Sequence, residues 1–119
     1  MNTHESLASA IVGHLVGDYL LQNDWMALNK KRDIGPCLVH CILWTLSVCL
    51  FAGWPVQGTI PAILIATHII QDHTDVITHW MELIGQTKFA TGPCAPWSVI
   101  VVDNVWHILT IWIVWRFVA

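Results

Sequence analysis

The sequence predicts an all-α, polytopic membrane protein: a four-transmembrane-helix antiparallel bundle that forms one domain over residues 1–119. Composition is the first reason, because 55% of the residues are hydrophobic and only 11% are charged, against about 25% charged in an average soluble domain. Four apolar segments are the second reason, since each approaches or exceeds the roughly 20 residues that cross a bilayer as a helix. The short connections between them are the third, because they make sequential helices antiparallel neighbours.

Residues that break helices set the boundaries of these segments. The expected helices cover about residues 6–25, 36–54, 59–84 and 97–118. The breaks between them are Gly35-Pro36, Gly53-Trp54-Pro55, Gly58 and Thr91-Gly92-Pro93. Asp18 and Gln22 interrupt the first segment, which makes it the least apolar of the four. Tryptophans near segment ends, such as Trp25 and Trp97, suit the interfacial aromatic belt of a membrane protein.

Basic residues orient the predicted bundle. Lys30, Lys31 and Arg32 lie in the first loop and Lys88 lies in the third, whereas the second loop has none and Arg116 ends the fourth segment. The positive-inside rule therefore places the first and third loops in the cytoplasm and both termini on the outer side. A net charge of −3 with five Lys and Arg argues against a nucleic-acid partner.

Three pairs of metal-capable residues lie inside the apolar segments, each spaced i to i+4 so that both side chains leave one helix face. The pairs are His14 with Asp18, His68 with Asp72, and Asp103 with His107. Ionisable groups among Leu, Ile, Val and Trp are costly in a membrane, so they usually face the bundle interior and mark a site or a pathway. We therefore expect these pairs to converge.

The third expected helix carries the longest polar stripe, suited to a metal site or a proton path. Its members are His68, Asp72, Asp75 and His79, whereas His73 points elsewhere. Measured from the expected cytoplasmic ends at about 1.5 Å per residue, ligands on all four helices lie in the cytoplasmic half of the membrane. His40 in the second helix shares this depth, and His68 is the deepest, beyond roughly 22 Å.

Other polar and small residues accompany the pairs. Gln22 shares a face with His14 and Asp18, and Asn104 beside Asp103 could hold a ligand or substrate oxygen. Lys30 belongs to a cluster that sets topology and contacts anionic lipid, and it could also guide an anionic substrate. Gly13 and Gly17 repeat at four residues, a spacing that lets another helix approach closely.

Histidine and carboxylate without a thiolate cluster suit Zn²⁺, Mn²⁺ or Fe²⁺, as one or two divalent ions. Two ions would use the ligands more fully and suit phosphoester hydrolysis, although some carboxylates could instead orient ligating histidines. The candidate metal ligands are His14, Asp18, His40, His68, Asp72, His79, Asp103 and His107. The candidate catalytic residues are Asp18, Asp72 and Asp103, and the candidate substrate-binding residues are Gln22, Lys30 and Asn104.

The run His14-Leu15-Val16-Gly17-Asp18-Tyr19-Leu20-Leu21-Gln22, with Lys30 a dozen residues after Asp18, resembles the opening motif of a family of unknown function. Its members are small bacterial and phage integral membrane proteins with H-x-x-G-D-[FY]-x-x-Q, H-x-x-x-D and D-[QN]-x-x-H motifs. The later motifs correspond to His68 with Asp72 and to Asp103-Asn104 with His107. Many members carry Lys where this chain has Asp75, which puts the role of Asp75 in question. The family is loosely similar to inner-membrane proteins labelled as candidate metal-dependent hydrolases.

These observations lead to the hypothesis of a metal-dependent hydrolase in the bacterial inner membrane, acting on a phosphoester of a lipid or nucleotide-like molecule from the cytoplasmic side. Its partners would be the lipid bilayer and this small substrate, with a homo-oligomer left open. A metal-ion or proton transporter or channel is one alternative. A structural or interaction membrane protein of phage origin is another, and haem binding between facing histidines is a third.

Overall fold

The computed structural model describes residues 1–54 and 57–119, and in these residues every regular element is a helix. The helices are α1 (Thr3–Tyr19), α2 (Asp24–Asn29), α3 (Ile34–Phe51), α4 (Thr59–His73), α5 (Val76–Leu83), α6 (Thr87–Thr91) and α7 (Trp97–Phe117). This confirms the predicted all-α class. The break expected at Pro55 lies outside the described residues.

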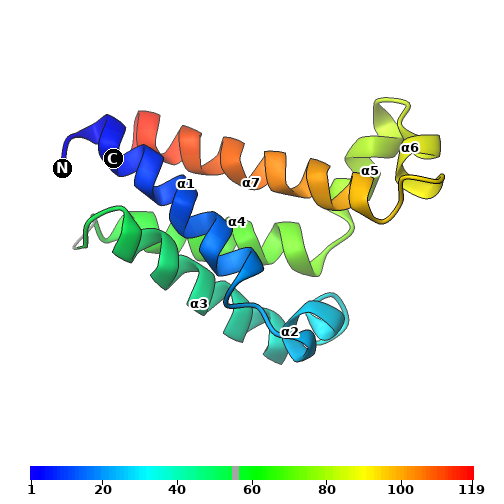
Figure 1. Cartoon of the computed structure of the whole chain (residues 1–119), viewed down its shortest axis with the longest axis horizontal. Coiled ribbons are helices and arrows are strands. Elements are labelled where there is room, and N and C mark those ends of the chain that lie inside the picture. The colour runs from blue at the N-terminus through cyan, green and yellow to red at the C-terminus, as the bar shows by residue number, and fades with distance from the viewer. Residues whose placement is uncertain (55–56) are drawn as a thin grey trace.

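Four long helices form the body of the molecule. α1 packs on α3, α3 packs on α4, and both α1 and α4 pack on α7. The short helices α2, α5 and α6 gather at one end of this bundle, and both chain termini lie at the other end (Figure 1). The loops that contain α2 and α6 hold Lys30, Lys31, Arg32 and Lys88, so four of the five basic residues share the end with the short helices.

Side-chain caps begin α1 near the N-terminus and begin α2 and α3 in the first connection. The Asn2 side chain accepts from the Glu5 amide at 2.9 Å, and Glu5 accepts from the Asn2 amide at 3.0 Å, which makes a capping box for α1. Asn23 caps α2, and Asp33 accepts from the amide of Gly35 to begin α3. The caps at Asn23 and Asp33 define where α2 and α3 begin in this connection.

The expected third helix is interrupted. α4 ends at His73, Thr74 is extended with φ −109° and ψ 171°, and α5 begins at Val76. The Thr74 hydroxyl donates to the carbonyl of Ile70. In a continuing helix, this carbonyl would instead accept from a backbone amide. α5 then turns away from the axis of α4 (Figure 1) and packs on α6 and α7.

This break corrects the expected depth of His68. The depth was counted from Ile84, whereas α4 ends eleven residues earlier, at His73. Counted from the observed helix ends at about 1.5 Å per residue, His68 lies about 7–8 Å from the end of α4, and His14 lies the same distance from the end of α1. The two histidines are therefore level, and His68 is not deeper than the others.

Among the described residues, two helices rather than four are long and apolar enough to cross a membrane. They are α3, with 18 residues, and α7, with 21. α1 has 17 residues and α4 has 15, so both fall short of the expected length. The polar residues near Asp18 end the first helix at Tyr19, and the break at Thr74 shortens the third.

The interior of the bundle divides into an apolar part and a polar part. Near the termini, the core is built from apolar residues such as Val48, Leu64, Ile111 and Val114. Toward the short helices, the buried side chains include four imidazoles and a carboxylate, namely His14, His40, His68, His107 and Asp72. The outer faces of the helices carry large exposed apolar side chains, for example Leu46, Val105 and Leu109.

Gly13 and Gly17 bring α1 against α3, as their spacing predicted. A Cβ on Gly13 would lie 2.7 Å from the Ser47 carbonyl oxygen and 2.8 Å from Val48 Cα. A Cβ on Gly17 would lie 2.8 Å from Trp44 Cδ1. At this close approach the Ser47 hydroxyl donates to the Gly13 carbonyl at 2.8 Å, which is a direct link between the two helices.

We expect Gly13→Ala to destabilise the protein by about 1–3 kcal/mol, because the new methyl group meets backbone atoms of α3 that cannot rotate away. Gly58→Ala is the matched control, since a Cβ there meets no described atom within 4 Å. Thermal unfolding in one detergent, followed by circular dichroism, measures both. Equal melting temperatures for wild type and Gly13→Ala would contradict the close α1–α3 contact.

Candidate metal centre

Four side chains from three helices meet in the polar part of the core. Asp18 comes from α1, His40 from α3, and His68 with Asp72 from α4. His40 Nε2 lies 3.1 Å from Asp18 Oδ1, 3.1 Å from Asp72 Oδ2 and 3.0 Å from His68 Nε2. His68 Nε2 lies 3.1 Å from Asp72 Oδ2 and 3.6 Å from Asp18 Oδ1. The convergence predicted from the i to i+4 pairs is present.

The spacing of these four atoms matches a tetrahedral metal site. Bonds of about 2.0–2.1 Å to nitrogen and oxygen ligands give a tetrahedron with edges of about 3.3–3.4 Å. Five of the six separations are 3.0 to 3.6 Å and lie around that edge length, and the two carboxylate oxygens lie within 4.8 Å of each other. Two imidazoles and two carboxylates also form a donor set that divalent ions such as zinc accept.

Asp72 also belongs to a second group of potential ligands, with Asp103 and His107 from α7. Its other oxygen, Oδ1, lies 3.2 Å from His107 Nε2. His107 Nδ1 donates to the backbone carbonyl of Asp103 at 2.7 Å, so the lone pair of the neutral ring is at Nε2 and points at Asp72. One carboxylate thus contributes to both groups.

Buried acceptor atoms outnumber their donors in this region. Among the described residues, Asp18 Oδ1 and His107 Nε2 are buried without a hydrogen-bond partner. A buried acceptor without a donor is costly, and two carboxylates in a mostly apolar core need compensating positive charge. A bound cation, or protons on the imidazoles, can supply that charge. The site therefore combines suitable ligands with a need for positive charge.

His14, which the sequence analysis expects to be a ligand, is not a member of either group. Its Nδ1 accepts from the Trp44 indole N–H at 3.0 Å, and its Nε2 donates to Asn104 Oδ1 at 2.6 Å. Both ring nitrogens are therefore engaged, and Asn104, expected to bind substrate, instead holds His14. The three side chains join α1, α3 and α7 directly beside the site.

Trp44 is the residue of the site that sequence reasoning missed. Its ring stacks on His68 with centroids 4.0 Å apart, while its N–H fixes the tautomer of His14. The signal was available, because Trp44 follows His40 by four residues and so shares its helix face. The N–H of a buried indole needs an acceptor, so a tryptophan is expected close to buried acceptor atoms.

His79 and Asp75 are not brought to the site. The break after His73 places both on the far side of Thr74, where they are exposed. Asp75 lies 3.5 Å from the ammonium of Lys31, and His79 is on α5. The polar stripe expected on one continuous helix therefore contributes only His68 and Asp72.

Lys30 reaches the site from α2. Its Nζ donates to Asp72 Oδ2 at 2.9 Å. Burial lowers the pKa of Lys30, but the Asp72 carboxylate raises it by more, so the pKa lies above its usual value and the group stays charged. His73 Nδ1 donates to the Lys30 carbonyl at 2.7 Å, which fixes the end of α2 against the end of α4.

Two cavities give access to this region from either side of Lys30. One, of about 230 Å³, is lined by Asp18, Tyr19, Gln22, Ala27, Lys30, Ile100 and Asp103. The other, of about 180 Å³, is lined by Lys30, Lys31, Gln71, Asp72, Ile77, Thr78, Val99, Ile100 and Asp103. The Asp103 side chain is 26% exposed, against 2% for Asp72. Asp103 is thus the carboxylate that a molecule in either cavity can reach, and Gln22 lines one of the two cavities.

The sequence profile of a family described as "Protein of unknown function (DUF3307)" matches residues 7–119. The chain belongs to this family. The matched range contains every residue of both ligand groups, together with Lys30 and Trp44. No curated protein matches the chain, and no solved structure matches it. The DUF3307 assignment carries no activity, so function has to be argued from the site.

We expect the purified protein to contain a divalent metal and Asp72→Asn to lose most of it, because Asp72 is common to both ligand groups. Asp75→Asn is the control, since it removes an exposed carboxylate from the same part of the chain. Elemental analysis by mass spectrometry measures both after purification in detergent. Equal metal content in the two variants would show that the cluster is not the binding site.

Proposed function

We propose that this protein is a metal-dependent hydrolase embedded in a membrane, which cleaves a phosphoester from the cytoplasmic side. The sharing of the buried Asp72 carboxylate between two groups of ligands is the observation that carries the proposal. A charged Lys30 and an accessible Asp103 border the same site. Buried ligands with an exposed acid and a cation at the rim are suited to hydrolysis of an anionic substrate.

The ligand groups suit one or two ions of Zn²⁺, Mn²⁺ or Fe²⁺. The first ion would take Asp18, His40, His68 and Asp72, and a second would take Asp72, Asp103 and His107. Such ions supply an acidified water at neutral pH and hold the oxygens of a phosphoryl group. The indole of Trp44 and the fixed ring of His14 would keep these ligands in place.

The chain's own residues would divide the remaining work. With one ion held by the first group, Asp103 stays free of metal, and because it is reached from both cavities it is suited to take a proton from the attacking water. Lys30 also borders both cavities and would pair with a phosphate oxygen. Asp72 would then remain with its histidine partners when Lys30 turns toward the substrate.

A membrane setting is supported by the distribution of side chains. Polar groups lie inside the bundle at one level, whereas apolar side chains cover its outer faces. α1 and α4 are about 25 and 22 Å long, less than the roughly 30 Å hydrocarbon core. The helices α2, α5 and α6 and four basic residues would then lie at the cytoplasmic interface, with both termini on the outer side. The metal site would lie within reach of water and lipid headgroups.

The geometry gives less support to the alternatives. In the described part of the chain, the core between the site and the termini is mainly apolar, with Thr45 and Ser47 as buried polar residues of α3, and it lacks the ionisable groups of a proton relay. His40 and His68 have their Nε2 atoms 3.0 Å apart, which leaves no space for a porphyrin between them. A purely structural role would require no metal, and the metal analysis of Asp72→Asn decides it.

We expect Asp103→Asn to lower kcat/KM for a metal-dependent phosphoesterase activity by about 10²- to 10⁴-fold, the usual contribution of a general base. His79→Ala should retain full activity, because the exposed imidazole on α5 lies outside the site. Release of p-nitrophenol from bis-p-nitrophenyl phosphate, with metal content measured in parallel, provides the assay. Unchanged activity in Asp103→Asn would remove this residue from the reaction.

Asp18→Asn tests the buried half of the site. Its carboxylate contacts His40 and lies among the first group of ligands, so we expect loss of both metal and activity while the helical content is retained. Circular dichroism checks the fold, and the same chromogenic assay checks turnover. Full activity with a full metal load would exclude Asp18 from the mechanism.

A further inference from the structure

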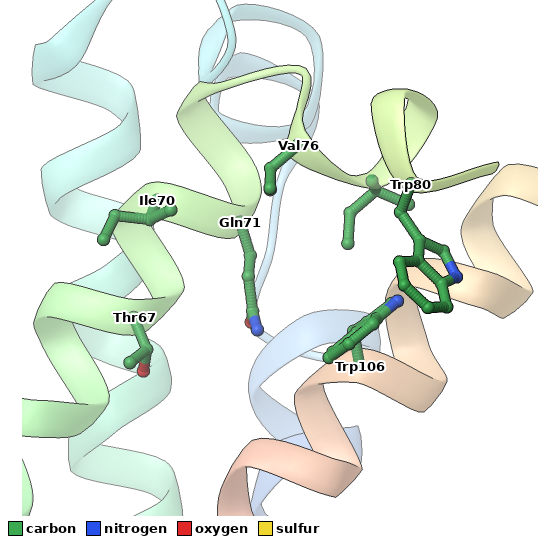
Figure 2. Close-up of a pocket in the computed structure, with 7 residues that line it drawn as sticks. Thr67, Ile70, Gln71, Val76, Trp80 and Trp106 are labelled. Atoms are coloured by element: carbon green, nitrogen blue, oxygen red, sulfur yellow. The ribbon is translucent and has the colours of Figure 1, made fainter. Parts of the chain in front are cut away.

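An apolar groove opens between α4, α5 and α7, outside the metal centre. It has a volume of about 270 Å³ and is lined by Thr67, Ile70, Gln71, Val76, Ile77, Trp80 and Trp106. Figure 2 shows the indoles of Trp80 and Trp106 together on one side of the groove, facing Gln71 and Val76, with Thr67 and Ile70 farther along α4. The two indoles meet edge to face, with centroids 5.2 Å apart, as aromatic pairs prefer.

The polar side chains of the groove are already satisfied. The Gln71 amide donates to the Thr110 hydroxyl at 3.0 Å, and the Thr67 hydroxyl donates to the Ile63 carbonyl at 2.8 Å. These hydrogen bonds engage the Gln71 amide N–H and the Thr67 hydroxyl, and the remaining lining residues offer mainly hydrocarbon surface. The groove therefore favours a hydrocarbon occupant.

The groove adjoins a cavity at the metal centre. Gln71 and Ile77 line both the groove and the neighbouring cavity of about 180 Å³, which reaches Lys30, Asp72 and Asp103. Each space alone is smaller than the roughly 300–1,000 Å³ of a small-molecule site, and together they enter that range. One molecule could therefore occupy both, with its apolar part in the groove and its polar part at the site.

The charges and the exposure of the lining residues indicate the chemical class of that molecule. Lys30 and Lys31 border the inner cavity together with Asp72 and Asp103, so a phosphate there would pair with the lysines and with the cation that the carboxylates hold in the proposed function. Ile70 is 54% exposed, Val76 42% and Trp80 38%, so the groove opens to the outer surface of the bundle. In the membrane setting proposed above, a hydrocarbon chain could enter from the side without leaving apolar surroundings.

We propose that the groove binds the hydrocarbon chain of a phosphorylated lipid whose phosphate lies between Lys30 and Asp103. This narrows the substrate from any phosphoester to an amphiphile, and so it rests on the proposed function for the role of the phosphate. A nucleotide-like substrate would leave the groove unfilled. The chain would hold the phosphate at the rim of the metal centre, where Lys30 is already placed.

Binding of alkyl phosphates tests the inference without requiring turnover. The protein is placed in phosphatidylcholine nanodiscs, and calorimetry compares dodecyl phosphate, inorganic phosphate and a nucleoside monophosphate, with empty nanodiscs as the reference for partitioning. We expect dodecyl phosphate to bind at least about tenfold tighter than inorganic phosphate after this correction, which corresponds to burying about two methylene groups. The nucleotide should bind no tighter than inorganic phosphate.

Variants that fill the groove identify the location. Val76→Trp introduces a bulky side chain at an exposed position of the groove, and Ile77→Trp does so at the passage shared with the inner cavity. Each should weaken dodecyl phosphate binding at least about tenfold and leave inorganic phosphate unaffected. Val105→Trp is the control, because this α7 side chain is exposed and outside the groove. If the melting curve shows that Ile77→Trp does not fold, the comparison of Val76→Trp with Val105→Trp tests the location of the chain.

Two results would overturn the inference. One is dodecyl phosphate binding no tighter than inorganic phosphate or the nucleotide. The other is an equal effect of Val76→Trp and Val105→Trp. Failure of the hydrolase proposal gives a different result from both. Chain-selective binding without turnover would support the lipid groove and contradict the hydrolase proposal. Turnover of a soluble phosphoester without chain selectivity would support the hydrolase proposal and contradict the lipid groove.

Discussion

The contacts of the Asp72 carboxylate with cationic and imidazole groups are the interaction on which the rest of the structure depends. One oxygen lies within 3.1 Å of His40, His68 and Lys30, and the other lies 3.2 Å from His107. These partners come from α3, α4, α7 and the end of α2. Because a buried carboxylate is costly without such partners, the four elements can meet only in an arrangement that surrounds it.

A second ring of contacts fixes the geometry of the first. Trp44 and Asn104 determine which nitrogen of His14 carries the proton, and the Asp103 carbonyl does the same for His107. Both nitrogens of His14 are engaged, so its ring cannot turn. His107 is held at Nδ1, so its Nε2 faces the site. The short helix α2 completes the enclosure through Lys30, and its position depends on the cap at Asn23 and on the His73 contact.

The break between α4 and α5 explains two features together. Because α4 ends at His73, His68 and Asp72 lie close to the end of the bundle, within reach of α2 and of the solvent-facing cavities. Because α5 turns toward α7, Trp80 comes against Trp106 and an apolar groove opens beside α4 (Figure 2). A continuous helix would have placed His79 on the same stripe and left no groove in this position.

The sequence alone determined the all-α class, the convergence of the three i to i+4 pairs and the close packing at Gly13, because each follows from helical periodicity and the cost of burying charge. The tertiary structure decided which candidates are ligands. His14 is occupied by a tryptophan from another helix, and His79 is carried away by a turn at Thr74. Neither outcome follows from the i to i+4 spacing of the polar residues, because the partner of His14 comes from another helix and the helix that carries His68 ends before His79. Two helices rather than four reach the length and hydropathy of a span for the same reason.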